Sequence, residues 1–153
     1  MLRSLLIGLV AGQRAMTPLS VLAGAARDGK LDPGSPAQLL KNPLLASGAV
    51  ALAGAEMAGD KMPSAPDRIV LVGLAARSAT AAFAGASLAP SGRRAAGAAL
   101  AVAAAVASSY VGWSLRVRAM RRFGQTATGA IEDAIVLGGG ALATRLIALP
   151  ARG

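Results

Sequence analysis

The sequence of 153 residues contains neither cysteine nor histidine. Without cysteine there are no disulfides and no thiolate nucleophile, and without histidine there is no imidazole base. The usual ligands of zinc and haem are therefore missing, and only oxygen-ligated metals such as magnesium or calcium remain possible. The sequence also lacks a Gly-x-Ser-x-Gly elbow and a phosphate-binding Gly-x-x-x-x-Gly-Lys-Ser/Thr loop. We therefore expect no cofactor, no bound metal and no enzymatic activity.

Charged and aromatic residues are scarce. Charged residues make up 15% of the chain and aromatic residues 3%, whereas 54% are hydrophobic. A soluble domain carries about 25% charged residues, so this composition indicates a membrane protein. The net charge of +9 does not indicate nucleic-acid binding, because no basic stripe is interleaved with aromatic side chains. The length suits a single domain covering residues 1–153.

Five apolar runs follow one another, over about 2–26, 43–62, 68–89, 95–115 and 129–149. Each is about 20 residues long, which is the length that an α-helix needs to cross about 30 Å of hydrocarbon. Barrel strands are shorter and alternate apolar with polar residues, which these runs do not. The pattern predicts an all-α, polytopic transmembrane helix bundle with five spans. Pro18 lies inside the first run, and we expect it to interrupt that helix and to free the carbonyl of residue 14.

Basic residues cluster at the end of the fourth run, after Tyr110 and Trp113. We expect this cluster to contact anionic lipid headgroups and, together with the N-terminus, to face the cytoplasm; it comprises Arg116, Arg118, Arg121 and Arg122. A cleaved signal peptide is an alternative for the first run, although Gln13 and Arg14 interrupt its apolar part. Small residues at Gly8, Gly12 and 138–140 predict close helix packing, either within the bundle or between subunits of a homo-oligomer.

Four segments together resemble a known family: 8–18 (GLVAGQRAMTP), 56–63 (EMAGDKMP), 76–77 (AR) and 131–133 (IED). In this order and spacing they are similar to the bacterial membrane family described as domain of unknown function 4126. The resemblance covers nearly the whole chain, and the acidic segments are its more specific parts. It implies a helical protein of the bacterial inner membrane, and it implies no activity.

Charged residues inside apolar runs are the best candidates for a functional site. Arg14 and Arg77 both fall deep in their runs, where an arginine costs at least about 2.5–3.5 kcal/mol. We expect Arg14 near the middle of its span, with acidic residues of other helices as partners. The candidate substrate- or ion-binding residues are Arg14, Thr17, Pro18, Glu56, Asp60, Lys61, Arg77, Thr80, Glu132 and Asp133. The segments 14–17 (RAMT) and 77–80 (RSAT) also suggest a faint internal repeat.

Two functions fit these charges. The first is a transporter or channel-like protein, in which Arg14 binds or gates a small polar or anionic species and Glu56 or Asp60 is the counter-charge. The second is a scaffold or assembly protein, in which the same charges form ion pairs that fix helix register. A third and weaker reading places magnesium and a lipid phosphate at Asp60 and Asp67. The sequence leaves the choice open.

Overall fold

A computed structural model describes residues 1–59, 71–123 and 138–139, and within these ranges the chain is helical with no strand. Over residues 1–59 and 71–123, five α-helices and two short 3-10 helices follow one another. The α-helices are α1 (Leu2–Gln13), α2 (Thr17–Arg27), α3 (Pro43–Gly59), α4 (Leu71–Leu88) and α5 (Arg94–Phe123). The 3-10 helices are η1 (Pro36–Lys41) and η2 (Ser91–Arg93).

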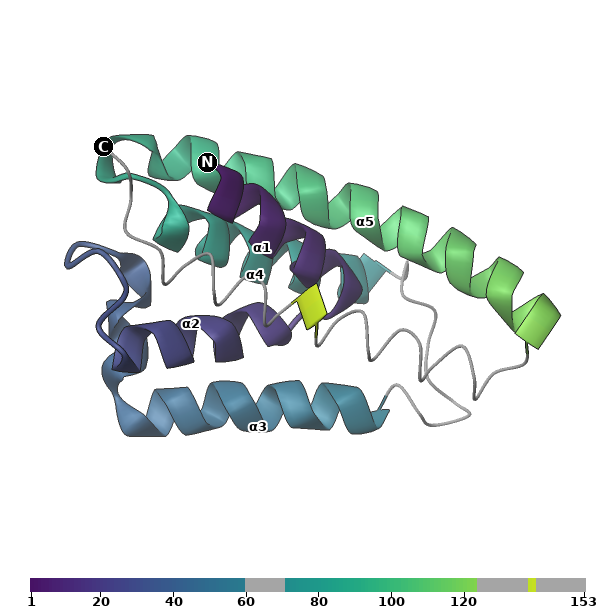
Figure 1. Cartoon of the computed structure of the whole chain (residues 1–153), viewed down its shortest axis with the longest axis horizontal. Coiled ribbons are helices and arrows are strands. Elements are labelled where there is room, and N and C mark those ends of the chain that lie inside the picture. The colour runs from purple at the N-terminus through teal and green to yellow at the C-terminus, as the bar shows by residue number, and fades with distance from the viewer. Residues whose placement is uncertain (60–70, 124–137, 140–153) are drawn as a thin grey trace.

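The first apolar run forms a helical hairpin instead of one long helix. Helix α1 has 12 residues and α2 has 11. The chain reverses its direction between them, so that α2 leads back toward the end of the bundle at which α1 starts (Figure 1). At 1.5 Å per residue they are about 18 and 17 Å long, well short of a membrane span. The interruption expected near Pro18 is present, and the run over 2–26 forms two short helices instead of one.

Pro18 starts the second helix of the hairpin. It is the second residue of α2, and the chain leaves helical geometry earlier, at residues 14–16. A proline is well tolerated there, because the first amides of a helix have no partner within it. The expectation that Pro18 breaks a helix from inside, by freeing the carbonyl of residue 14, is therefore wrong.

Helices α1, α4 and α5 pack through small residues, and we call them the core trio. The Ser4 hydroxyl donates to the carbonyl of Gly85 at 3.0 Å, and further along α1 the side chain of Ala11 lies in one cluster with Ala81, so α1 and α4 are antiparallel. A Cβ atom added at Gly8 would clash with the backbone of Ala101, and one at Gly12 with the backbone of Ala105. Helix α1 is therefore parallel to α5, and the predicted close packing at Gly8 and Gly12 occurs within the bundle.

Helices α2 and α3 form an outer pair on the core trio. They are antiparallel, and α3 packs mainly against α2 and η1. Larger apolar side chains fill the end of the molecule near η1, where a cluster includes Leu22, Leu31, Leu40, Ile7 and Ala84. The Ser35 hydroxyl donates to the carbonyl of Ser87 at 2.8 Å at the same end. This end therefore joins the outer pair firmly to the core trio.

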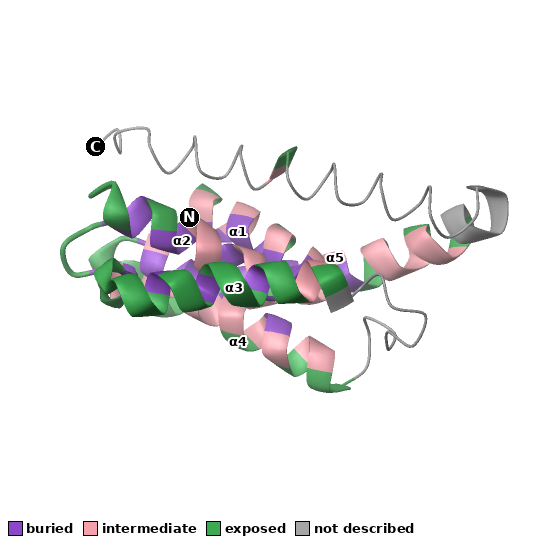
Figure 2. Ribbon diagram, turned by 90° about the horizontal axis from the view of Figure 1, so that it is seen from below, coloured by how far each residue is buried: buried purple, intermediate pink, exposed green. Residues whose placement is uncertain are grey.

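Much of the surface of α3 is exposed (Figure 2), and several of its exposed side chains are large and apolar. Leu44 is 77% exposed, and Leu45, Val50 and Leu52 are exposed as well. Two segments, Leu71–Leu88 and Ser91–Arg118, are long and apolar enough to cross a membrane by length and composition. They correspond to the runs predicted over 68–89 and 95–115. Helix α3 is apolar but shorter, and most of the run over 129–149 lies outside the described residues.

Candidate functional site

The turn between α1 and α2, residues 14–16, is the hairpin tip. Arg14 has an extended backbone with φ −144° and ψ 118°, and Met16 returns toward helical geometry with φ −91° and ψ −19°. Two helix ends meet here, and each leaves backbone groups without partners inside its helix. The amide of Arg14 still donates to the Val10 carbonyl at 2.9 Å, and the amides of Leu19 and Ser20 donate to the carbonyl of Met16.

Glu56 of α3 closes the tip from the outer pair. Its Oε1 accepts the Ala15 amide at 2.7 Å, and its Oε2 accepts the Met16 amide at 2.9 Å. Helix α2 has no side-chain cap of its own at Met16. A carboxylate is the favoured partner at this place, because exposed amides and the helix dipole make a helix N-terminus electropositive. Glu56 thus caps α2 from another helix.

Helix α5 closes the tip from the core trio. The Ser109 hydroxyl donates to the carbonyl of Gly12 at 2.9 Å, and the Ser108 hydroxyl donates to the carbonyl of Leu9 at 2.9 Å. The Gln13 side-chain amide donates to the carbonyl of Ser108 at 2.6 Å. Gly112 leaves room for that amide, because an added Cβ would lie 2.6 Å from Nε2 of Gln13. These contacts fix the last turn of α1 and hence the position of Arg14.

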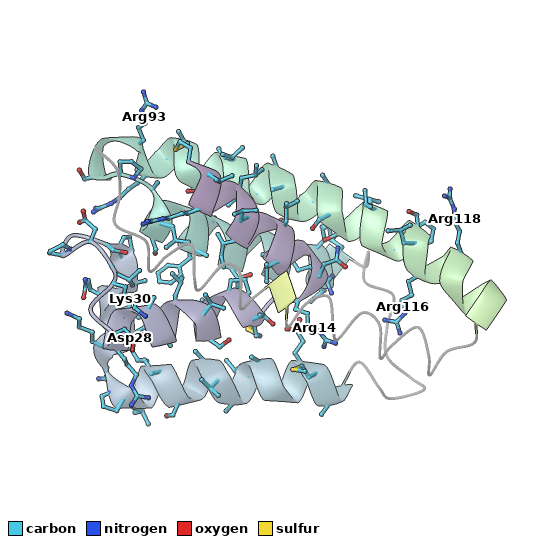
Figure 3. The ribbon with its side chains drawn as sticks, in the orientation of Figure 1. Arg14, Asp28, Lys30, Arg93, Arg116 and Arg118 are labelled. Carbon is cyan, nitrogen blue, oxygen red and sulfur yellow. The ribbon has the colours of Figure 1, made fainter. Side chains whose placement is uncertain are left out.

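Two arginines are buried at the level of the tip. Arg14 is 3% exposed and Arg77 is 6% exposed. The antiparallel register of α1 and α4 brings Ser4 to Gly85 and Ala11 into one cluster with Ala81. Continuing this register by one more turn places Arg77 level with Arg14. Figure 3 shows Arg14 beside the turn between the two helices of the hairpin.

Glu56 does not pair with either arginine. Within the described part of the chain, the one salt bridge joins Lys30 and Asp28, with 2.6 Å between Nζ and Oδ2. Arg14 and Arg77 each interact with a group other than the carboxylate of Glu56. The carboxylate of Glu56 is instead used by the two tip amides. The tip therefore brings two guanidinium groups and one carboxylate to one level without a Glu56–arginine ion pair.

The depth of the tip follows from α5. Ser108, which contacts Gln13, lies 14 residues after the start of α5 and eight before Arg116. At 1.5 Å per residue, the tip is about 21 Å from one end and about 12 Å from the first arginine of the other. Arg14 thus lies at the end of a short helix within the apolar length of α5.

Of the remaining predicted site residues, the structure describes Thr17 and Thr80. Thr17 is the first residue of α2, half-buried next to the tip. The Thr80 hydroxyl donates within α4 to the carbonyls of Ala76 and Arg77, both at 3.1 Å. Asp60, Lys61, Glu132 and Asp133 lie outside the described residues, as does Asp67. In the basic cluster, Arg116 is half-buried and Arg118 is exposed on α5.

The internal repeat does not appear in the structure. Arg14 lies in an extended turn, whereas Arg77 lies within the continuous helix α4. Sequence reasoning also missed the role of Ser108 and Ser109. Two adjacent hydroxyl side chains inside the apolar run over 95–115 could have indicated this role, since such side chains hydrogen-bond to neighbouring helices.

The described helices define a class of protein. It is an all-helical bundle with two helices of membrane-spanning length and a broken helical hairpin whose tip is capped by a carboxylate. Over residues 1–150 the chain matches the family described as domain of unknown function, DUF4126, and it belongs to that family. The resemblance drawn from the four sequence segments is confirmed. No curated protein and no solved structure matched the chain.

Proposed function

We propose that the protein is an integral protein of the bacterial inner membrane that lets a small polar or anionic species cross at the hairpin tip. In this proposal α3, α4, α5 and the run over 129–149 cross the bilayer, and the α1–α2 hairpin enters and leaves from one side. The length and apolarity of α4 and α5 support membrane insertion. The exposed leucines of α3 also support it, because lipid is their natural surrounding.

One observation carries the proposal of passage: a helix break with a buried arginine lies within the apolar length of the bundle. Non-helical backbone at membrane depth occurs only where it is buried in protein or lines a water-filled cavity. Broken helices of this kind place helix ends at the substrate and ion sites of transporters. Arginines at such depth are costly and mark pathways for ions and substrates.

Arg14 and three residues around the tip each have a role in this proposal. Arg14 is the main anion-binding or gating group, because it lies in the break itself. Arg77 adds a second positive charge at the same level. Glu56 is the counter-charge and accepts the amides of Ala15 and Met16 directly before α2. The Thr17 hydroxyl, at the start of α2, is a neutral ligand.

The hairpin also changes the proposed topology. Ser4 lies near Gly97, close to the start of α5, so the N-terminus and the arginine-rich end of α5 are at opposite ends of the bundle. We keep the arginine-rich end in the cytoplasm, because dense arginine clusters are retained there. The N-terminus then faces the other side of the membrane, and the earlier expectation that both face the cytoplasm is withdrawn.

The scaffold function is the second candidate. It is favoured because side chains of the protein already bind the backbone groups of the tip. Glu56 accepts hydrogen bonds from the amides of Ala15 and Met16, and the Ser109 hydroxyl donates one to the carbonyl of Gly12. A tip closed in this way also suits a purely structural bundle. Its exposed apolar helices would then contact lipid or further copies of the chain.

Flux through proteoliposomes tests the first proposal. The purified protein is reconstituted and the uptake of chloride, nitrate, phosphate and small carboxylates is measured. We expect flux of at least one of them, a loss of most of that flux in Arg14→Ala, and partial retention in Arg14→Lys. Arg93→Ala is the matched control, because Arg93 is exposed at the far end of the bundle; it should leave the flux unchanged.

The outcomes separate the two candidates. If the wild-type protein carries none of these anions, or if Arg14→Ala carries them at the wild-type rate, passage through this site is refuted. The scaffold candidate then predicts that Arg14→Ala lowers the stability of the bundle without any effect on permeability.

A further inference from the structure

The core trio is held together by contacts that leave it little freedom to move. Gly85 and Gly97 meet so closely that a Cβ added at Gly97 would lie 2.7 Å from the carbonyl oxygen of Gly85. Gly8 and Gly12 lie equally close to the backbone of α5. Helices that touch backbone to backbone cannot slide without steric clash, so we treat α1, α4 and α5 as one rigid unit.

The outer pair is packed differently, because α3 packs mainly against α2 and η1 and only weakly against the helices of the core trio. Gly24, Gly48 and Gly54 lie on exposed faces of the pair, where an added Cβ would meet no atom within 4 Å. Near η1 the outer pair is joined to the core trio by the leucine cluster and by the hydrogen bond from Ser35 to Ser87. At the other end, α3 is hydrogen-bonded to the tip through the carboxylate of Glu56, which accepts the amides of Ala15 and Met16.

We propose that Glu56 is a releasable latch. When its hydrogen bonds to the amides of Ala15 and Met16 break, the Glu56 end of α3 moves away from the hairpin tip. The η1 end of α3 and the core trio stay in place. The movement exposes the tip, including Arg14, from the side that α3 covers. The latch depends on the hairpin and not on transport, so it stands or falls separately from the proposed function.

Two features make the latch suitable for release. Both of its hydrogen bonds come from one side chain, which lies three residues before the end of α3. A single rotation of that side chain therefore breaks both bonds. In this movement α3 would turn at its start, where Asn42, an exposed residue with an extended backbone of φ −62° and ψ 121°, joins it to η1.

Distance measurements between spin labels test the latch, and the lack of cysteine in the sequence makes every introduced thiol unique. The labels are placed at exposed positions. The pair Ala58→Cys and Ala107→Cys reports on the Glu56 end of α3 relative to α5. The pair Ala75→Cys and Ala107→Cys reports on the core trio at the same level. The pair Ser47→Cys and Ala95→Cys reports on the η1 end.

The expected result is selective. Glu56→Ala should broaden the 58–107 distance distribution and shift it to longer distances, and leave the 75–107 and 47–95 distributions as they are. Asp28→Asn is the control for the loss of an acid, because Asp28 is exposed at the η1 end, and it should change none of the three. The latch is refuted if the 58–107 distribution does not respond to Glu56→Ala, or if all three pairs change together.

Hydrogen exchange on the unsubstituted chain keeps the test valid if Glu56→Ala does not fold. A releasable latch predicts that the amides of Ala15 and Met16 exchange faster than the amide of Ala105 in the middle of α5, because they are freed by a local opening. In Glu56→Gln, which keeps one acceptor, their exchange should rise by about tenfold or more. Exchange of Ala15 and Met16 as slow as that of Ala105 overturns the proposal.

Discussion

The packing of Gly8 against α5 gives a prediction that can be worked out in detail. In Gly8→Ala, the added methyl group would lie 2.7 Å from Cα and 2.9 Å from the carbonyl carbon of Ala101, and closer still to its carbonyl oxygen. All three atoms are backbone, so no side chain can rotate to relieve the clash. Helices α1 and α5 must move apart by about 1 Å to restore ordinary contact.

The free-energy change combines two opposing effects. Overpacking of a tight contact costs about 1–3 kcal/mol. Replacing glycine by alanine inside a helix gains about 0.8–1.0 kcal/mol. Because separation of the helices also loosens the hydrogen bond from Ser4 to Gly85 on the same helix, we expect a net loss of about 1–2 kcal/mol.

Gly48→Ala is the matched control. Gly48 also lies inside a helix, but an added Cβ meets nothing within 4 Å, so only the helix-propensity gain of up to about 1 kcal/mol applies. Unfolding is followed by circular dichroism as denaturing detergent replaces a mild one. Gly8→Ala should unfold earlier than the wild type and Gly48→Ala should unfold no earlier. The packing argument is wrong if Gly8→Ala is as stable as Gly48→Ala.

Two further predictions concern local contacts. In Gly112→Ala, the methyl group should displace the side chain of Gln13 and remove its bond to Ser108, at a cost of about 1 kcal/mol in the same unfolding assay; the cost should vanish in a Gln13→Ala background, and an equal cost in both backgrounds would contradict the contact. At the exposed ion pair, the Lys30 ammonium hydrogen-bonds Asp28 and lowers the pKa of that carboxyl. The pair therefore adds stability above the ordinary pKa of aspartate and loses it as the pH falls. Lys30→Ala should raise the pKa of Asp28 toward its ordinary value in an NMR titration, and an unchanged pKa would show that the pair does not form in solution.

The helical class, the family and the two long helices could all be read from the sequence. Runs of about 20 apolar residues specify helices of a given length, because backbone hydrogen bonds in an apolar surrounding must be satisfied within the segment. The runs over 68–89 and 95–115 accordingly match α4 and α5. The sequence also marked Arg14 as an exceptional residue, because a charge inside an apolar run is costly, and the structure shows it buried.

The course of the first run could not be read from composition. An apolar run with one proline is compatible with a kinked helix and with two helices that fold back. The choice rests on partners far away in the chain: Glu56 binds the amides that the break leaves open, and Ser109 binds the carbonyl of Gly12. No local pattern around Pro18 contains these residues.

By itself, therefore, the sequence determined the helical class of the protein, the apolar character of its helices and the presence of a charge, Arg14, inside an apolar run. These features follow from residue types and their order along the chain. Only the tertiary structure decided that the first run turns back at residues 14–16, that Glu56 binds amides in preference to an arginine, and that glycines bring α1 against α5. These features depend on which distant backbone groups meet, and that is settled by the packing of whole helices.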